Sequence, residues 1–389
     1  MQFSKRMDGL APYLFATIEK KIQEKRKAGI DVISLGMGDP DIATPDYIVE
    51  EMKRQVADAR NHRYPTNAGL EVFAEAAAAF YKRRFGVDID PATEFFPLLG
   101  CKEGLAHVIL ATADPGDVVL VPDPGYPVYY AGTIISGATP LIMPLKAEND
   151  FLPDLDAISA EDRRKAKLMF VSYPNNPTAA VVPEGSDFYE RVAAFGRDNG
   201  LAVVSDNAYS ELTFDGYVAP SFLQSPGAKE AGVELFSFSK PFNMTGWRIG
   251  FAVGNKDILA ALWKLKTNMD SGMFEALQRT AAFILNGSWD FVDEMMAVYA
   301  RRRDLVLHAL SAIGLHAPQP QATIYMWVPV PEGYTSASFA EKVLDEAAVV
   351  VTPGNGYGTY GEGFVRISLT APDERIEEAV ARIEKSLKL

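Results

Sequence analysis

Residues 233–254 read VELFSFSKPFNMTGWRIGFAVG, and the rest of the chain is interpreted around this stretch. Two short apolar runs flank a polar turn, a pattern that predicts a hairpin or two neighbouring strands. Lys240 lies where the first run ends, with Ser237 upstream and Arg248 downstream. A lysine at a strand end is most often a solvated loop residue. The alternative is an amine that forms a Schiff base, beside a hydroxyl and a guanidinium that hold a phosphate.

Composition and charge exclude several classes of protein. The chain has 389 residues, enough to bury a large core and to form two domains. Its net charge of -13 argues against nucleic-acid binding, which needs a basic face. The single cysteine, Cys101, excludes an intramolecular disulfide, and the four scattered histidines offer no zinc spacing. We find no signal-peptide core and no bilayer-spanning run, so we expect a cytoplasmic protein that binds no metal, nucleic acid or membrane.

The order of apolar and amphipathic segments predicts an α/β fold. Strands are expected at 95–99, 118–121, 139–143, 168–172 and 201–204, and again within the opening stretch. Because helical segments separate most of these strands, the sheet should be largely parallel. After residue 255, helices at 256–268, 274–286 and 289–312 lead into a smaller α+β region. We assign 45–290 to a large cofactor-binding domain, and 1–44 with 291–389 to a small domain.

Polar side chains stand at the expected carboxyl ends of the strands, where an open α/β sheet binds its ligands. They are Tyr126, Asn176, Asp206, Tyr209, Ser237, Lys240 and Arg248, joined by the backbone of Cys101 and Lys102 at the start of a helix. Each has an ordinary alternative as a turn former, a helix cap, a packing residue or a structural ion pair. Together they match pyridoxal 5'-phosphate, which needs a lysine for its aldehyde, a cradle for its phosphate and a carboxylate for its pyridine nitrogen.

This interpretation gives each side chain a role. Lys240 binds the aldehyde and later serves as general base, while Asp206 keeps the pyridine nitrogen protonated. Tyr209 and Asn176 hold the ring's 3-oxygen, and Tyr126 stacks on the cofactor face. The phosphate falls to the residues that offer a hydroxyl, a guanidinium or helix N-terminal amides, namely Ser237, Arg248, Cys101 and Lys102.

The same residues stand in motifs that resemble class I/II, fold-type I aminotransferases over essentially the whole chain. SFSK at 237–240 with GWRIG at 246–250 resembles that family's lysine signature, and NNPT at 175–178 and DNAY at 206–209 resemble its other core motifs. The resemblance implies a mainly parallel central sheet between helices, with an amino acid and a 2-oxo acid as substrates. It also implies a homodimer with shared active sites, in which Tyr64 reaches the phosphate of the partner subunit.

The resemblance also assigns substrate contacts and a closer subgroup. Arg366 is expected to pair with the substrate α-carboxylate, Gly38 to present its backbone there, Asn176 to contact the substrate, and Phe15 to lie near the distal end with the 268–273 loop. The stretches PYLF at 12–15, LGMGDPD at 35–41, YKRRFG at 81–86, DPGYPVY at 123–129 and DSGMF at 270–274 are similar to LL-diaminopimelate aminotransferases. We therefore expect transfer of an amino group, from LL-2,6-diaminopimelate or another amino acid, to 2-oxoglutarate in ping-pong order.

Three positions depart from the subgroup's pattern and bear on the substrate more than on the reaction. Ala179 replaces a common glycine, Cys101 a common serine, and Pro241-Phe242 a common Thr-Tyr.

Several other functions remain open. Neighbouring subgroups act on alanine, aspartate or aromatic amino acids, and a carbon–sulfur β-lyase uses the same fold and cofactor. A non-catalytic regulator would carry a fused DNA-binding segment, for which the first 30 residues are too short. A dinucleotide oxidoreductase is disfavoured, because no G-x-G-x-x-G opens a helix after a strand.

Overall fold

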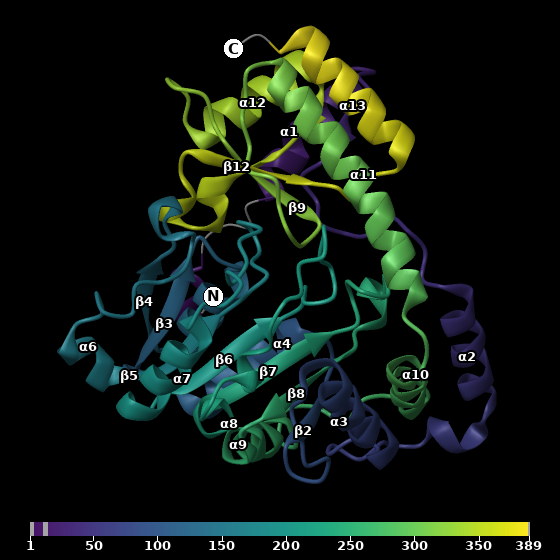
Figure 1. Cartoon of the computed structure of the whole chain (residues 1–389), viewed down its shortest axis with the longest axis vertical. Helices are drawn as coiled ribbons and strands as arrows, with labels where there is room; N and C mark the ends of the chain where they lie inside the picture. The colour runs from purple at the N-terminus through teal and green to yellow at the C-terminus, as the bar shows by residue number, and fades with distance from the viewer. Residues whose placement is uncertain (1–3, 11–14, 388–389) are drawn as a thin grey trace.

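The computed structural model describes residues 4–10 and 15–387, and its largest element is a seven-stranded sheet (Figure 1). The strands follow the order β2-β8-β7-β6-β5-β3-β4. Their bounds are β2 (Phe95–Leu98), β3 (Val118–Asp123), β4 (Thr139–Pro144), β5 (Ala166–Val171), β6 (Ala202–Asn207), β7 (Gly232–Ser237) and β8 (Gly250–Gly254). Neighbours are parallel, except that β8 runs antiparallel to β7 and β2. The expected α/β fold with a largely parallel sheet is confirmed.

The stretch 233–254 forms the two neighbouring strands that its pattern predicts. β7 pairs antiparallel with β8, so that Val233 lies opposite Gly254 and Ser237 opposite Gly250. The polar turn between the two strands carries Lys240 and Arg248 at the end of the sheet where β7 finishes.

Both faces of the large sheet are buried, as the continuous apolar runs of its strands require. On β5, Leu168 and Phe170 join the core beneath α4, whereas Met169 and Val171 join the core on the opposite face. The first face is covered by α4 (Cys101–Thr112), α5 (Pro127–Ser136) and α9 (Lys256–Lys266), and the second by α3 (Glu71–Phe85), α7 (Phe188–Asn199) and α8 (Ala228–Ala231). α10 (Glu275–Asn286) packs on α3 and on α2 (Asp46–Ala57).

The C-terminal part builds a second, smaller sheet from β11 (Thr352–Pro353), β12 (Phe364–Ser368) and β9 (Tyr325–Pro329). α12 (Ser336–Ala347) packs on this sheet, and α13 (Asp373–Ser386) packs on α12 and on α11 (Asp290–Ala312). Figure 1 shows α11 running from the side of α10 up to α13. β1 (Ile33–Ser34), which follows α1 (Phe15–Lys27), pairs with β10 (Val349–Val350) and ties the N-terminal segment to this part. A division into domains at about residues 44 and 290 stays a proposal.

Most expected elements lie within a few residues of their predicted bounds, with one informative difference. Strand β6 extends to Asn207, so Asp206 belongs to the strand itself and not to the loop after it. Just before α2, the Thr44 hydroxyl donates to the Asn243 carbonyl oxygen at 2.8 Å. Among the described residues, no helix is both long enough and apolar enough to cross a membrane.

Candidate active site

A cleft of about 360 Å³ lies at the carboxyl ends of β5, β6 and β7, where β9 and β12 of the smaller sheet approach them. Its walls contain the predicted residues Gly38, Cys101, Lys102, Tyr126, Asn176, Asp206, Tyr209, Ser237, Lys240, Arg248 and Arg366. The fold thus brings together residues from widely separated strand ends, as expected for an open α/β sheet.

Two predicted site residues are not among the described residues that line this cleft. Tyr64 lies in the loop before α3, and its side chain is 89% exposed. Its expected contact is with a partner subunit and stays a prediction. Phe15 begins α1, but its side chain lies outside the described part of the chain, so its predicted role is not tested either.

Asp206 supplies a buried carboxylate that is only half satisfied. Its Oδ2 accepts a hydrogen bond from the Tyr129 hydroxyl at 2.7 Å, whereas its Oδ1 is buried without a hydrogen-bond partner. Burial raises the pKa of Asp206 to about 6, against the lowering effect of the Tyr129 hydrogen bond. A buried acceptor without a partner is costly, so Oδ1 is suited to a cationic N–H donor from a ligand.

Lys240 follows β7 in the polar turn and reaches across the cleft. Its Nζ donates to the carbonyl oxygen of Gly38 at 2.7 Å, which links the turn to the segment after β1. The half-buried Lys240 thus lines the cleft, which favours the site interpretation over the ordinary alternative of a solvated loop lysine.

An anion cradle surrounds the start of α4. Gly100 precedes this helix with φ of 80°, and a Cβ added there would lie 2.3 Å from Nη2 of Arg248. Arg248 itself takes a left-handed conformation, and its Nη1 donates to the Thr245 carbonyl oxygen at 2.7 Å. Backbone amides, a helix dipole and a guanidinium thus converge where a phosphate would bind.

Cys101 joins this cradle by its backbone and not by its thiol. Its Sγ donates to the carbonyl oxygen of Phe236 at 3.2 Å, and burial raises the pKa of the thiol well above its usual value. The cysteine therefore acts as a small, neutral packing residue at a position where the subgroup commonly has serine.

Arg366 is held in place from several sides. Its Nη1 donates to Oδ1 of Asn176 at 2.8 Å and its Nη2 to the Gly36 carbonyl oxygen at 2.9 Å, while its Nε is buried without a partner. The guanidinium carbon lies 4.0 Å from the ring centre of Tyr325 and 4.8 Å from that of Tyr357. A guanidinium fixed between two rings is preorganised to bind a planar carboxylate.

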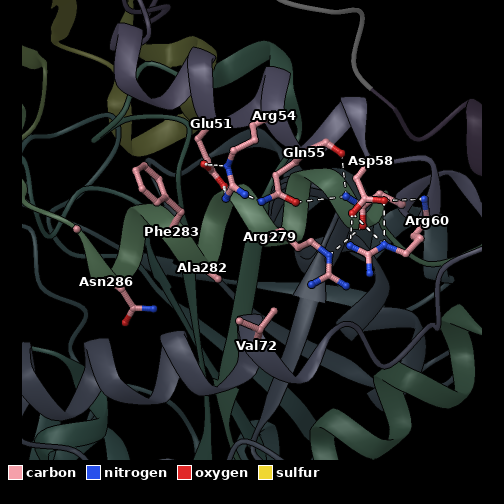
Figure 2. Close-up of a pocket in the computed structure, with 12 residues that line it drawn as sticks. Glu51, Arg54, Gln55, Asp58, Arg60, Val72, Arg279, Ala282, Phe283 and Asn286 are labelled. Carbon is pink, nitrogen blue, oxygen red and sulfur yellow. Dashed lines mark hydrogen bonds and ion pairs between the residues drawn. The ribbon is translucent and has the colours of Figure 1, made fainter.

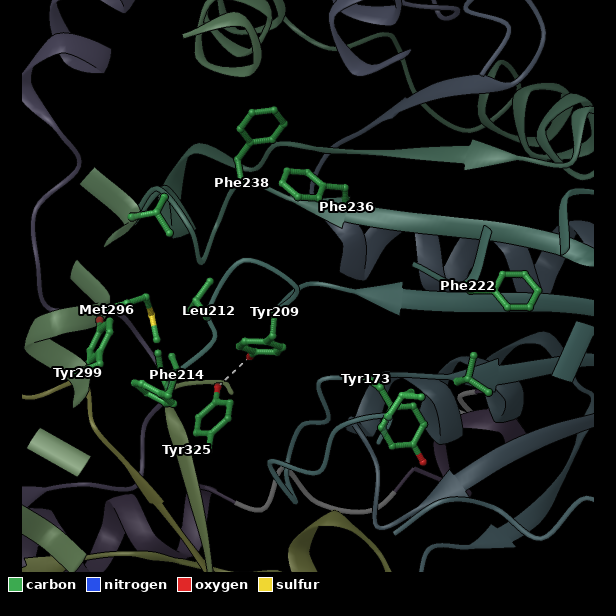
Figure 3. Close-up of a cluster of buried hydrophobic side chains, with 14 of the residues drawn as sticks. Tyr173, Tyr209, Leu212, Phe214, Phe222, Phe236, Phe238, Met296, Tyr299 and Tyr325 are labelled. Atoms are coloured by element: carbon green, nitrogen blue, oxygen red, sulfur yellow. Dashed lines mark hydrogen bonds between the residues drawn. The ribbon is translucent and has the colours of Figure 1, made fainter. Parts of the chain in front are cut away.

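Tyr209 meets a residue that the sequence interpretation did not include. Its hydroxyl lies 3.1 Å from the hydroxyl of Tyr325, and both phenols are buried (Figure 3). Besides Tyr325, the interpretation missed Tyr129, the partner of Asp206. Tyr129 stands three residues after Tyr126 at the start of a predicted helix, but no sequence signal shows that its hydroxyl points toward Asp206.

The departures from the subgroup's pattern have structural explanations. Phe242 is fully buried, with its ring centre 5.9 Å from that of Phe238 and 4.9 Å from that of Trp289, so it extends the core beneath the Lys240 turn. Ala179 has φ of 57°, the left-handed region that favours the glycine common there. In the 268–273 loop, Asp270 pairs with Lys266 at 2.8 Å and does not line the cleft.

A second cavity, of about 640 Å³, lies between α2, α3 and α10 (Figure 2). Four of its five charged lining residues form pairs, Arg54 with Glu51 and Arg60 with Asp58, and the fifth, Arg279, lies 3.7 Å from Glu275 outside the lining. It lacks the unpartnered buried groups of the first cleft, and we do not assign it a ligand.

The cleft and the fold agree with comparisons to known proteins. The family model described as aminotransferase class I and II matches residues 30–383. The chain belongs to the class I and II aminotransferases. It is 52% identical, over 100% of this chain and 99% of the relative, to an LL-diaminopimelate aminotransferase of Moorella thermoacetica. The apo structure of BacF from Bacillus subtilis has a TM-score of 0.95 and 39% identity, covering 100% of this chain and 99% of that one. A mutant aspartate aminotransferase of Thermus thermophilus has a TM-score of 0.91 and 29% identity, covering 99% of each chain.

Membership of this family confirms the predicted reaction class and implies pyridoxal phosphate as the cofactor. The cleft of this aminotransferase fits that cofactor on three independent observations. Asp206 offers a buried oxygen without a partner, Gly100 makes room for the Arg248 guanidinium, and Lys240 holds its amine in the same cleft, 2.7 Å from the Gly38 carbonyl oxygen.

Proposed function

We propose that this aminotransferase moves an amino group from LL-2,6-diaminopimelate to 2-oxoglutarate in a ping-pong reaction, with pyridoxal phosphate held in the cleft described above. The observation that carries the proposal is that one cleft contains both the Lys240 amine and the Oδ1 oxygen of Asp206, which is buried without a hydrogen-bond partner. Relatives about half identical to this chain, which bear the name LL-diaminopimelate aminotransferase, support the choice of donor.

Each residue of the cleft then has a task that its surroundings support. When bound, the cofactor withdraws the electron pair that is left on the substrate α-carbon as its proton departs. Asp206 stays ionised and holds the proton on the pyridine nitrogen. The amide oxygen of Asn176 is taken by Arg366, so its NH₂ group, together with the Tyr209 hydroxyl, is the group able to donate to the ring oxygen. The Lys240 amine moves the α-proton.

The α-carboxylate of the substrate is assigned to Arg366. Its Nε lacks a partner, and the contacts of its other nitrogens with Asn176 and Gly36 fix the plane of the guanidinium. The carbonyl oxygen of Gly38 accepts a hydrogen bond from Lys240, so the backbone at residue 38 borders the cleft in which Arg366 would bind the α-carboxylate.

The distal end of the substrate is assigned to two charged residues of the cleft, Lys102 and Asp39. The described lining residues include four cations, of which Lys240, Arg248 and Arg366 already have roles. The fourth, Lys102, lies over the Tyr126 ring at 5.9 Å and forms no ion pair with a described residue. Asp39 also lines the cleft. A substrate whose distal end carries an ammonium and a carboxylate, as diaminopimelate does, has a complementary charge for each.

The active unit is proposed to be a homodimer, which would give Tyr64 a role. Tyr64 is one of the most exposed aromatic side chains described, and an exposed ring is suited to an intersubunit contact. The cytoplasm stays the predicted location.

A panel of amino donors tests the substrate assignment. With 2-oxoglutarate as acceptor, LL-2,6-diaminopimelate should give a kcat/KM well above those of aspartate, alanine and phenylalanine. A preference for aspartate would instead place the chain functionally with the aspartate aminotransferase that it resembles in fold. Release of pyruvate from a cysteine-type donor, without glutamate formation, would indicate a carbon–sulfur β-lyase.

A further inference from the structure

Tyr325 begins β9, in the smaller sheet, yet its hydroxyl enters the cleft of the larger one (Figure 3). Its side chain is buried, and its hydroxyl lies 3.1 Å from that of Tyr209. The guanidinium of Arg366 lies on the ring face of Tyr325, 4.0 Å from the ring centre. Tyr325 therefore contacts both the phenol assigned to the cofactor ring and the cation assigned to the substrate carboxylate.

The backbone at residue 38 is shaped around the same hydroxyl. A Cβ added at Gly38 would lie 2.0 Å from the Tyr325 hydroxyl oxygen, so only glycine leaves room for it. The Gly38 carbonyl oxygen accepts from Lys240 at 2.7 Å. Glycine at residue 38 therefore leaves room for the Tyr325 hydroxyl beside the backbone that binds the Lys240 amine.

The electrostatic surroundings make the two phenols unequal. Burial raises the pKa of Tyr209 well above its usual value, and the neighbouring Tyr325 raises it further. Burial acts to raise the pKa of Tyr325, whereas the nearby charges of Arg366 and Lys240 act to lower it, and the net shift of this pKa is downward. The titratable and charged groups that face Tyr325 are Tyr209 after β6, Lys240 after β7, Arg366 on β12, Tyr126 before α5 and Tyr299 on α11.

A phenol has one proton, and the proton of Tyr209 is assigned to the cofactor's ring oxygen, so in this pair Tyr325 is the donor and Tyr209 is the acceptor. We propose that Tyr325 is a positioning residue that acts through Tyr209, leaving the Tyr209 proton free to point at the cofactor's ring oxygen. A phenol that accepts one hydrogen bond becomes a better donor of another, so the contact also strengthens that donation. This inference rests on the proposed function, since it needs the cofactor in the cleft.

The test is a visible-absorbance titration of the full-length protein loaded with pyridoxal phosphate. Tyr325→Phe keeps the ring on Arg366 and removes only the hydroxyl. A weaker donation to the ring oxygen makes the Lys240–cofactor linkage hold its proton more tightly, so the pH midpoint should rise by about half a unit to one unit. In a Tyr209→Phe background, the same change should add no further shift, because the route runs through Tyr209.

Two further variants keep the test decisive. Tyr173→Phe also removes one buried, hydrogen-bonded phenol, but Tyr173 does not line the cleft, so its midpoint should match the wild type. Replacing Tyr325 by 3-fluorotyrosine keeps the hydroxyl and makes it a stronger acid, so the midpoint should fall. An unchanged midpoint in Tyr325→Phe, or an equal shift in Tyr173→Phe, would overturn the role of Tyr325. A wild-type protein that gains no visible band with the cofactor would contradict the proposed function itself.

Discussion

Tyr129 donates its hydroxyl proton to Oδ2 of Asp206 at 2.7 Å, while the other carboxylate oxygen of Asp206 is buried without a partner. One oxygen is therefore anchored by helix α5 and the other is available to a ligand. Because one oxygen is fixed, the Asp206 carboxylate presents its other oxygen to a ligand in a defined direction.

Tyr129→Phe should shift the pH dependence of catalysis. The Tyr129 hydrogen bond lowers the pKa of Asp206, so its loss should raise that pKa above the present value of about 6. Because Asp206 must be ionised, the acidic limb of the kcat/KM profile should move up by about one pH unit. Tyr130→Phe, on the same helix but exposed, is the matched control. Identical acidic limbs in Tyr129→Phe and the wild type would show that the bond does not tune Asp206.

Asp206→Asn should stabilise the cofactor-free protein while abolishing most activity. The pKa of Asp206 is about 6 in the folded chain against 3.8 for the free group, so the folded state binds the proton more tightly. Wild-type stability therefore falls as pH rises through this window, by an amount on the order of 1–3 kcal/mol. Urea unfolding at pH 7 should show the variant to be more stable, with the difference lost as the pH falls below 3.8. Turnover should drop by several orders of magnitude. A variant less stable than the wild type at pH 7 would contradict this electrostatic account.

Arg366→Lys should weaken binding of both substrates. A lysine keeps the charge but loses the planar pair of donors that a carboxylate needs, so KM should rise about 10- to 100-fold. Arg375→Lys is the control, because Arg375 pairs with Asp31 outside the cleft. Steady-state kinetics with each substrate varied in turn measure the effect, and an unchanged KM would remove Arg366 from the carboxylate site.

Lys102→Gln should discriminate between substrates by their distal ends. If Lys102 binds a distal carboxylate, kcat/KM should fall about 10-fold for diaminopimelate and 2-oxoglutarate. It should change little for alanine and pyruvate, which have no such group. Lys167→Gln, at an exposed position on β5, is the control. Equal losses for all four compounds would instead place Lys102 at the cofactor phosphate.

Residues at strand ends could be predicted from the sequence, because the ends of parallel strands meet at one edge. This rule predicts that Asn176, Asp206 and Lys240 lie together, and the structure brings them into one cleft. Tyr325 could not be found in this way. It begins a strand of a separate sheet, and only the packing of β9 against the cleft brings it to Tyr209.

The directions in which side chains point could not be predicted from the sequence either. Cys101 was assigned by its backbone, and no pattern shows that its thiol turns toward Phe236. The role of Pro241-Phe242 could not be predicted either, because Phe242 is buried against Trp289, which is distant in the sequence and lies just before α11.

The most direct test of the central claim is the first half-reaction in the absence of any 2-oxo acid. Wild-type protein loaded with pyridoxal phosphate is mixed with LL-2,6-diaminopimelate alone, and its visible absorbance is followed. The account predicts that the band disappears with about one equivalent of donor per site and returns when 2-oxoglutarate is added, whereas Lys240→Ala shows neither change. An unchanged wild-type spectrum, or ordinary turnover by Lys240→Ala, would contradict the account.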